Sequence, residues 1–370
     1  MKFISPGRIE IVGNHTDHNH GKVLVAAIEL SLKAEAHPTG DNVIVIDSRG
    51  FPPVRVDLAS TAKVPAEVGS PQGLVRGVAD GFTKRGLHIG GFHAAAVGDI
   101  PVGAGVSSSA AFELLAAQIL NEFYNGGAAD RVTLAKIAQY AENVYMEKPS
   151  GLLDQMGIAL GGATYIDFQD IHKPRIESVA PQILSEYKIV VVNTGGSHAD
   201  MTAHYAAIKA EMQAAAKYFG KDYLADVPPR AFYGAVSALQ RAVGGRAILR
   251  AAHFYEENAR VEKAFKALKA GKLSAFFSAV RESGISSYAL LQNCYAPEDA
   301  VQRIPLALYL AGRVLKKGAY RVHGGGFAGT ILAFVHASEF GAFTETFAPV
   351  FGRENIMVTG IRALGTSKIE

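Results

Sequence analysis

A glycine- and serine-rich stretch, Pro101–Ala110, carries residue types suited to binding an anion. Apolar spacing after it predicts a helix over Ser107–Phe123. Glycines let the backbone approach a ligand, and the first amides of a helix lack internal partners, so a phosphate fits there. A helix N-cap would use one serine and leave Gly103, Gly105 and two further hydroxyls unexplained. We therefore predict a phosphate-binding loop.

Familiar nucleotide motifs are absent. No Gly-Lys pair is followed by Ser or Thr, which excludes a Walker A loop, and the protein-kinase signatures His-Arg-Asp and Asp-Phe-Gly do not occur. Gly324–Gly329 formally fits the dinucleotide pattern G-x-G-x-x-G, but strand-like residues Thr330–Val335 follow it where that pattern requires a helix. We interpret it as a tight turn between strands.

A second polar cluster lies near the N-terminus, where His15, Asp17, His18 and His20 occur within six residues. Imidazole and carboxylate groups could bind zinc or another transition metal. The same side chains supply donors and acceptors for sugar hydroxyls, and they also occur in solvated turns. The local sequence leaves these three interpretations open.

Two carboxylates could act on a phosphate held by the loop. Glu142 falls in a predicted helix, Arg131–Tyr145, and Asp154 falls in Pro149–Gln155. A carboxylate beside a glycine is more often a turn former than a base. Placed by a phosphate loop, however, Asp154 could accept a proton from an attacking hydroxyl.

Composition narrows the class of protein. The 370 residues are 49% hydrophobic and 19% charged, which predicts a folded globular protein of two domains. The net charge of +3 is scattered, so we expect no nucleic-acid partner. Cys294 is the one cysteine, no signal peptide is apparent because Arg8 and Glu10 interrupt the N-terminus, and no apolar run could span a bilayer. We expect a cytoplasmic protein without a membrane partner.

The remaining patterns position these motifs on strands and helices. Strands are expected at Ile9–Val12, Val23–Ile28, Val43–Asp47, Phe92–Val97, Lys188–Asn193, Tyr320–Val322 and Thr330–Val335. Further helices are expected at Asp200–Phe219, Ala231–Val243, His253–Ala270 and Glu298–Lys316. A shift towards helix, together with Pro174 and Pro181, predicts a domain boundary within Asp167–Pro181.

Taken together, the motifs resemble the GHMP kinase superfamily and, within it, the galactokinase family. The stretches that carry the resemblance follow the family's order: Gly7–Leu24, Pro101–Ala110, Gly151–Gln155, Asn193–His198 with Tyr205 beyond it, and Gly324–Gly329. Five ordered matches are far more specific than any single one.

The resemblance implies an α/β (α+β) fold of two domains. Residues 1–172 would form a domain like ribosomal protein S5 domain 2, and residues 173–370 a ferredoxin-like α+β domain, with the active site in the cleft between them. The implied activity is ATP-dependent phosphorylation of the anomeric hydroxyl of galactose or a close derivative. We expect ATP and a sugar as the small-molecule partners, and a monomer.

Site residues are implied position by position. Asp154 would be the base, with Arg8 beside it to favour the ionised carboxylate. Mg²⁺ would be bound by Ser109 and Glu142. The ATP phosphates would be wrapped by Gly103, Ala104, Gly105, Val106, Ser107, Ser108 and Ser109. The sugar would be bound by Asn14, His15, Asp17, Gly151 and Tyr205.

The chain departs from the family pattern at several positions. Asn14 replaces the usual Glu at the position that contacts the hydroxymethyl end of galactose, which removes a charge and adds a donor. His18 replaces Tyr, Glu10 replaces Asn and Ala328 replaces Gly. A galactose modified at C6 or C2, such as galacturonate or galactosamine, is therefore an alternative substrate. A metal-dependent hydrolase and a non-catalytic sugar and nucleotide sensor are alternatives of other classes.

Overall fold

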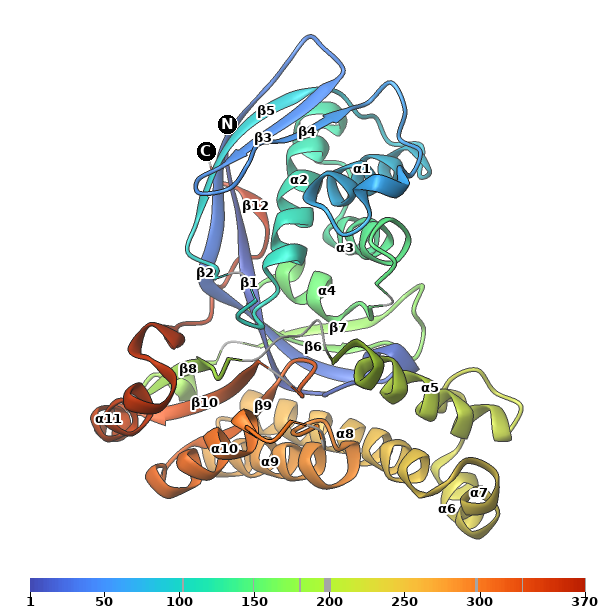
Figure 1. Ribbon diagram of the computed structural model, residues 1–370, viewed down its shortest axis with the longest axis vertical. Coiled ribbons are helices and arrows are strands. Elements are labelled where there is room, and N and C mark those ends of the chain that lie inside the picture. Colours follow the sequence, from blue (N-terminus) through green and yellow to red (C-terminus); the bar gives the residue numbers. More distant parts are fainter. Residues whose placement is uncertain are drawn as a thin grey trace. The chain divides into compact units, whose positions relative to one another are not determined.

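The chain forms two units in the computed structural model (Figure 1). The structure describes residues 1–101, 103–148, 150–179, 181–195, 201–296, 299–327 and 329–369. Unit 1 contains residues 1–8, 26–162 and 361–370, and unit 2 contains residues 9–25 and 163–360. Both units are therefore built from segments that are distant in sequence.

This division differs from the single boundary predicted after residue 172. The boundary in this region lies between Gly162 and Ala163. The proline-containing region Asp167–Pro181 instead holds the loop and second strand of an antiparallel pair, β6 (Ala163–Asp167) and β7 (Arg175–Val179). Its polar, proline-interrupted sequence thus marks a strand connection inside unit 2, which composition alone does not distinguish from a linker.

The sheet of unit 1 has the strand order β12-β1-β2-β5-β3-β4. The strands are β1 (Lys2–Val12), β2 (Lys22–Pro38), β3 (Val43–Ser48), β4 (Val54–Asp57), β5 (Phe92–Gly98) and β12 (Ser367–Lys368). β3 is parallel to β5 and antiparallel to β4. β1 and β2 both continue into unit 2, because residues 9–25 belong to that unit.

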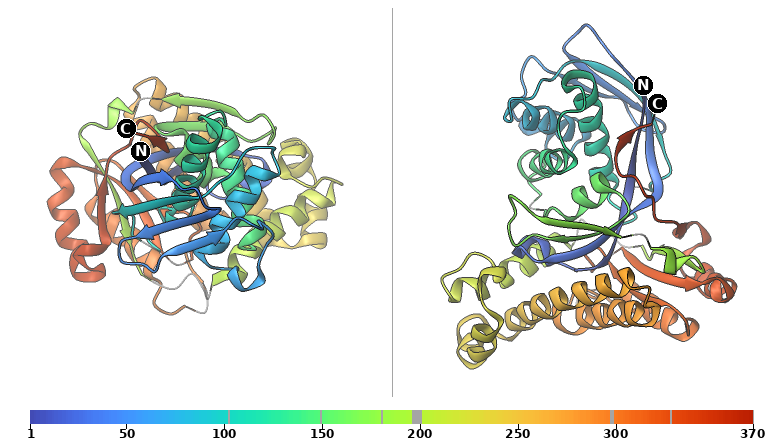
Figure 2. Two further views of the ribbon diagram at one scale, coloured as in Figure 1. Left: turned by 90° about the horizontal axis from the view of Figure 1, so that it is seen from above. Right: turned by 180° about the vertical axis from the view of Figure 1, so that it is seen from behind.

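Four helices cover one face of this sheet (Figures 1 and 2). They are α1 (Pro71–Thr83), α2 (Ser108–Asn125), α3 (Arg131–Tyr140) and α4 (Leu153–Leu160). The predicted apolar side of α2 is buried, including Leu114, Leu115 and Ile119, and the helix ends at Gly126 in the left-handed conformation. A π-helical turn, Ala141–Tyr145, follows α3 directly and carries Glu142.

Unit 2 contains a four-stranded sheet in the order β11-β8-β10-β9, antiparallel throughout. Its strands are β8 (Tyr187–Asn193), β9 (Ala319–His323), β10 (Thr330–His336) and β11 (Ile356–Thr359). Gly324–Gly329 connects β9 to its antiparallel neighbour β10, and Gly324 and Gly326 have φ of 66° and 83°. The predicted strand-to-strand turn is confirmed, and a dinucleotide-binding loop is ruled out at this position.

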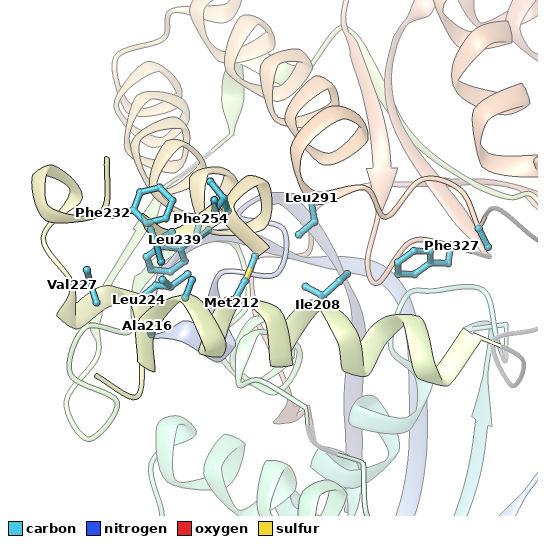
Figure 3. Packing of buried hydrophobic residues seen from close by; sticks show 14 residues of the cluster. Ile208, Met212, Ala216, Leu224, Val227, Phe232, Leu239, Phe254, Leu291 and Phe327 are labelled. Atoms are coloured by element: carbon cyan, nitrogen blue, oxygen red, sulfur yellow. The ribbon is translucent and has the colours of Figure 1, made fainter. Parts of the chain in front are cut away.

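Seven helices complete the described part of unit 2: α5 (Thr202–Tyr218), α6 (Pro229–Gly234), α7 (Val236–Val243), α8 (Gly245–Lys269), α9 (Leu273–Ser286), α10 (Arg303–Val314) and α11 (Phe340–Phe351). One core packs α10 and α11 on the sheet through residues such as Phe343 and Ile331. A second core joins α5, α7 and α8 through Met212, Leu239 and Phe254 (Figure 3). Among the described helices, none is long and apolar enough to span a membrane.

The expected elements are confirmed where the sequence pattern was strong. Every expected strand lies within an observed one, although the strands β1 and β2 are longer than expected. The expected helix Ala231–Val243 is broken at Ala235 into α6 and α7. Other elements were not expected from the sequence: the helices α1, α4, α9 and α11 and the strands β4, β6, β7, β11 and β12. Asp200 and Glu298, where two helices were expected to begin, lie outside the described residues.

Candidate active site

Asp154 lies in the first turn of α4 and receives hydrogen bonds on both carboxylate oxygens. Arg8 Nε donates to Oδ1 at 2.7 Å, and the Ser107 hydroxyl donates to Oδ2. Arg8 comes from β1, and Ser107 precedes the first residue of α2. Three segments of unit 1 therefore meet at one carboxylate, which joins two of the predicted site residues to the predicted phosphate loop.

Arg8 also secures the glycine-rich loop. Its Nη1 donates to the Gly105 carbonyl at 2.7 Å, and its backbone N–H donates to the Val106 carbonyl at 3.2 Å. The neighbouring residue, Gly7, needs the absence of a side chain, because a Cβ there would lie 2.9 Å from the Val106 oxygen. The strand therefore holds the loop and Asp154 in a fixed relation.

The loop backbone has a conformation suited to an anion. Gly103, Gly105 and Ser107 have φ of 76°, 71° and 61°, whereas the buried residues Ala104 and Val106 between them do not have positive φ. Left-handed residues in such turns help to form the concave arrays of amides that bind phosphates. Ser107 adopts this conformation although it is not glycine, a strain found mainly at functional positions.

The surroundings of Asp154 set its protonation state. Burial on its own raises the pKa of this carboxyl, but the charge and hydrogen bond of Arg8 and the hydroxyl of Ser107 outweigh burial and lower the pKa below its usual value. Asp154 is therefore an ionised acceptor at neutral pH.

Glu142 is a buried carboxylate held by two donors. Lys148 Nζ donates to its Oε1 at 2.6 Å, and Gln155 Nε2 donates to its Oε2 at 2.8 Å. Gln155 directly follows Asp154, so α4 places the two carboxylates in one neighbourhood of unit 1.

Glu113 was overlooked by the sequence analysis. It lies on α2, one helical turn after Ser109, and is fully buried. Within the described residues, neither of its carboxylate oxygens has a hydrogen-bond partner, and neither does Gln155 Oε1. Burial, and next the charge of Glu142, raise the pKa of Glu113 well above its usual value. The sequence contains one sign of this residue: a glutamate on the otherwise apolar face of a buried helix is unusual and indicates a special role for Glu113.

The polar cluster near the N-terminus belongs to unit 2. Asn14 is fully buried, and its Nδ2 donates to the Gly324 carbonyl at 2.8 Å and to Glu10 at 3.3 Å. Its Oδ1 accepts from Asn293 at 2.8 Å and from Ser287 at 3.2 Å. Protein groups therefore use all four hydrogen-bonding positions of the amide, which differs from the expectation that this side chain itself contacts the sugar.

The imidazoles of this cluster bind one another and the glycine turn. His15 Nε2 lies 3.1 Å from the Gly325 carbonyl, and its Nδ1 lies 3.3 Å from His18 Nε2. Asn19 Nδ2 lies 3.0 Å from His18 Nδ1. The amide can donate to His18, His18 to His15, and His15 to the carbonyl only if both rings are neutral. Burial lowers the pKa of His15 to about 4, and that of His18 well below its usual value.

These bonds occupy the ring nitrogens that a metal would need. No group of three or more His, Cys, Asp or Glu side chains is placed to hold a metal ion in the described ranges. The geometry therefore favours the sugar-binding interpretation of the cluster over a metal centre.

Tyr205, the second group on the glycine turn, comes from α5. Its hydroxyl donates to the Gly326 carbonyl at 2.8 Å, and a Cβ on Gly325 would lie 2.5 Å from its ring. Asp17 accepts the backbone N–H of His18 at 3.0 Å, and Gly151 immediately precedes the turn into α4. Pro149, Ala328 and residues 196–198 of the fourth family motif lie outside the described residues.

A buried glutamate on α8, Glu257, also escaped the sequence analysis. It accepts the N–H groups of Gly13 at 2.9 Å and Asn14 at 3.3 Å, and Arg260 Nε donates to it at 2.7 Å. Burial alone would raise the pKa of Glu257, but His253 and then the guanidinium groups of Arg260 and Arg321 lower it to about 2. No local motif indicates this role.

Known families and proteins resemble this chain in sequence. Residues 73–162 match the model of the GHMP kinases N terminal domain, and residues 2–38 match the galactokinase galactose-binding signature. A galactokinase from Clostridium tetani (strain Massachusetts / E88) is 29% identical over 350 residues, which are 93% of this chain and 86% of the relative.

Solved structures of kinases are also similar to this chain. Lactococcus lactis galactokinase complexed with galactose superimposes with a TM-score of 0.85 and 27% identity, over 100% of this chain and 95% of that chain. Methanococcus jannaschii mevalonate kinase has a TM-score of 0.68 at 14% identity, over 99% of this chain and 98% of that one, which shows a shared fold only.

The match to the GHMP kinases N terminal domain and the similarity to a galactokinase structure over the whole chain indicate an ATP-dependent sugar kinase with the GHMP kinase fold. The chain carries the galactokinase galactose-binding signature at residues 2–38 and is similar to galactokinases over most of its length.

Proposed function

We propose that this kinase transfers the γ-phosphate of ATP to the anomeric hydroxyl of galactose. The observation that carries the proposal is Asp154, a carboxylate held ionised by Arg8 and by Ser107 of the phosphate loop. An ionised acceptor attached to a phosphate loop is the arrangement that a sugar kinase needs to direct a hydroxyl at a phosphoryl group.

Asp154 acts in this proposal by orienting the attacking hydroxyl and taking its proton. Its lowered pKa makes it a weak base, which suits a loose transition state in which the proton leaves late. The Arg8 guanidinium offsets charge near the transferred group, and its bond to Gly105 keeps Gly103 to Ser109 shaped around the phosphates.

The donor groups near Glu142 fit Mg²⁺, which commonly uses one or two carboxylates together with phosphate oxygens. Glu142 is a buried carboxylate, and buried acceptor oxygens of Glu113 and Gln155 near it lack donors among the described residues. We assign Ser109 and Glu142 as the protein ligands. When bound, Mg²⁺ would neutralise charge on the phosphates.

Within unit 2, the sugar is assigned to His15, Asp17 and Tyr205, and a sugar contact by Gly151 of unit 1 stays a prediction of the sequence. Asn14 ties this loop to the glycine turn, since its amide donates to the Gly324 carbonyl. A galactose derivative with a modified C6 or C2, such as galacturonate or galactosamine, stays the second candidate substrate, on the sequence departure at position 14 alone. Cytoplasmic location and a monomeric state stay predictions of the sequence.

Sugar choice is tested by ADP release across galactose, galacturonate, galactosamine and N-acetylgalactosamine. We expect galactose to give the highest kcat/KM, by about tenfold or more, since one lost polar contact is worth about 1–3 kcal/mol. The Asp154→Asn protein supplies the background rate. A preference for galacturonate would replace galactose by the second candidate. Sugar binding in calorimetry without ADP release from any sugar would instead identify a sensor.

Galactose affinity should be insensitive to pH near neutrality. With the His15 pKa lowered to about 4, its ring stays neutral and its Nδ1 keeps accepting from His18 until the pH falls towards that value. We expect the calorimetric Kd for galactose to change less than about twofold between about pH 6 and pH 8, and to rise below about pH 5. Replacing the surface histidine His93 by Gln should leave this profile unchanged. A tenfold loss of affinity between pH 8 and pH 6 would contradict a neutral His15.

A further inference from the structure

Lys148 occupies one oxygen of the carboxylate assigned to the metal. Its ammonium lies 2.6 Å from Glu142 Oε1, and its backbone N–H donates to the Glu142 carbonyl at 3.2 Å. The second oxygen, Oε2, is already bound by Gln155. Oε1 is therefore the oxygen that a cation would reach, and Lys148 now covers it.

The two partners differ in freedom to move. The Lys148 side chain is 64% exposed, whereas that of Glu142 is 5% exposed. A lysine with an exposed stem can rotate its ammonium into water without uncovering the core, but Glu142 cannot leave its buried position. Any exchange of partners at Oε1 must therefore occur by departure of Lys148.

The local charges determine what happens to Lys148 when a metal ion binds Glu142. Asp154 is paired with Arg8 and Glu142 with Lys148, so each of these two carboxylates is balanced by one cation without a metal. A divalent cation at Glu142 would place like charge beside the Lys148 ammonium, and at such distances this repulsion is strong even near a protein surface. This repulsion disfavours simultaneous binding of Lys148 and a metal ion to the Glu142 carboxylate.

We propose that Lys148 is a resident cation that holds Glu142 in the metal-free enzyme and competes with the divalent metal for it. This inference rests on the proposed function, because it takes Glu142 as a metal ligand. Lys148 is thus a positioning residue: it keeps the carboxylate neutralised, and it raises the metal concentration needed to load the site. The phosphates of a nucleotide supply further negatively charged oxygens to the metal ion. The metal therefore displaces the lysine more readily when a nucleotide is present.

The test measures Mn²⁺ binding without turnover. Free Mn²⁺ is followed by electron paramagnetic resonance during titration of the nucleotide-free protein and of its ADP complex. Lys148→Met should bind Mn²⁺ about tenfold more tightly than wild type, and Lys148→Gln should behave similarly, because both remove the competing charge. Lys148→Arg should remain near wild type. A loss of structure could not produce tighter binding.

A matched control is available next to this pair. Lys63 forms an ion pair with Glu147 at 2.6 Å in the same unit, so Lys63→Met removes an equal charge without touching Glu142. We expect its Mn²⁺ affinity to be that of wild type. An equal gain in Lys63→Met would attribute the effect to net charge and overturn the proposal.

The variant Glu142→Gln tests the metal assignment of Glu142 separately from the competition by Lys148. It should weaken Mn²⁺ binding and abolish the gain of Lys148→Met in the double variant. If Glu142→Gln binds Mn²⁺ like wild type, the metal assignment in the proposed function is wrong. If Glu142→Gln weakens binding but Lys148→Met does not strengthen it, with or without ADP, only the competition by Lys148 is wrong. Absence of detectable Mn²⁺ binding in every variant also counts against the competition.

Discussion

Asp154→Asn is expected to reduce kcat for sugar phosphorylation by about 10²–10⁴-fold, the usual contribution of a positioned base. The amide cannot take the proton of the hydroxyl. It also replaces one of the two oxygens that accept from Arg8 and Ser107 by an NH₂ group, so the link between the base and the loop is weakened. Steady-state ADP release checks the result, and a single cooperative thermal transition shows that the variant is still folded, although the lost ion pair with Arg8 should lower its midpoint.

Asp130→Asn is the matched control for this change. Asp130 caps α3 in the same unit by accepting the Thr133 N–H at 2.7 Å, and no active-site residue depends on it. Because Asn is also a good N-cap, this variant should keep both turnover and stability. Full turnover in Asp154→Asn would remove Asp154 from the mechanism.

Glu257→Ala is expected to lower the free energy of unfolding by about 3–5 kcal/mol, the usual cost of breaking a buried ion pair by removing one partner. The change leaves Arg260 without its buried carboxylate and the Gly13 and Asn14 amides without their acceptor. Chemical denaturation at neutral pH measures the loss. Glu282→Ala on the neighbouring α9 removes an ion pair whose two side chains are 47% and 43% exposed, so its cost should stay below about 1 kcal/mol.

The same residue predicts how stability depends on pH. The pKa of Glu257 is lowered to about 2 in the folded protein, from the ordinary 4.5, so the unfolded chain binds the proton more readily. Its contribution, about 3 kcal/mol, is therefore fully present above pH 4.5 and is lost as the pH falls towards 2. Wild type should lose more stability than Glu257→Gln over that range. Parallel pH profiles for the two proteins would show that Glu257 is not held ionised.

Local patterns predicted much of this fold because their causes are local. The glycines and serines of Pro101–Ala110 determine which backbone conformations the loop can adopt, and the apolar side of α2 follows from helical spacing. The strand-like residues after Gly324–Gly329 argue against a dinucleotide-binding loop, and this stretch connects two antiparallel strands, β9 and β10. The sequence did not predict the helices α1, α4, α9 and α11.

The sequence by itself determined which residues can do chemistry here: a loop that suits phosphate, an Asp and an Arg that suit a hydroxyl in attack, and a polar loop that suits a sugar. Only the tertiary structure decided what each of them touches. Arg8 and Asp154 are 146 residues apart and Glu10 and His323 are 313 apart, yet each pair is hydrogen-bonded. Burial and pairing at such separations depend on which elements pack together, so the inward-facing Asn14, the ionised Glu257 and the lysine on Glu142 become visible only in the folded chain.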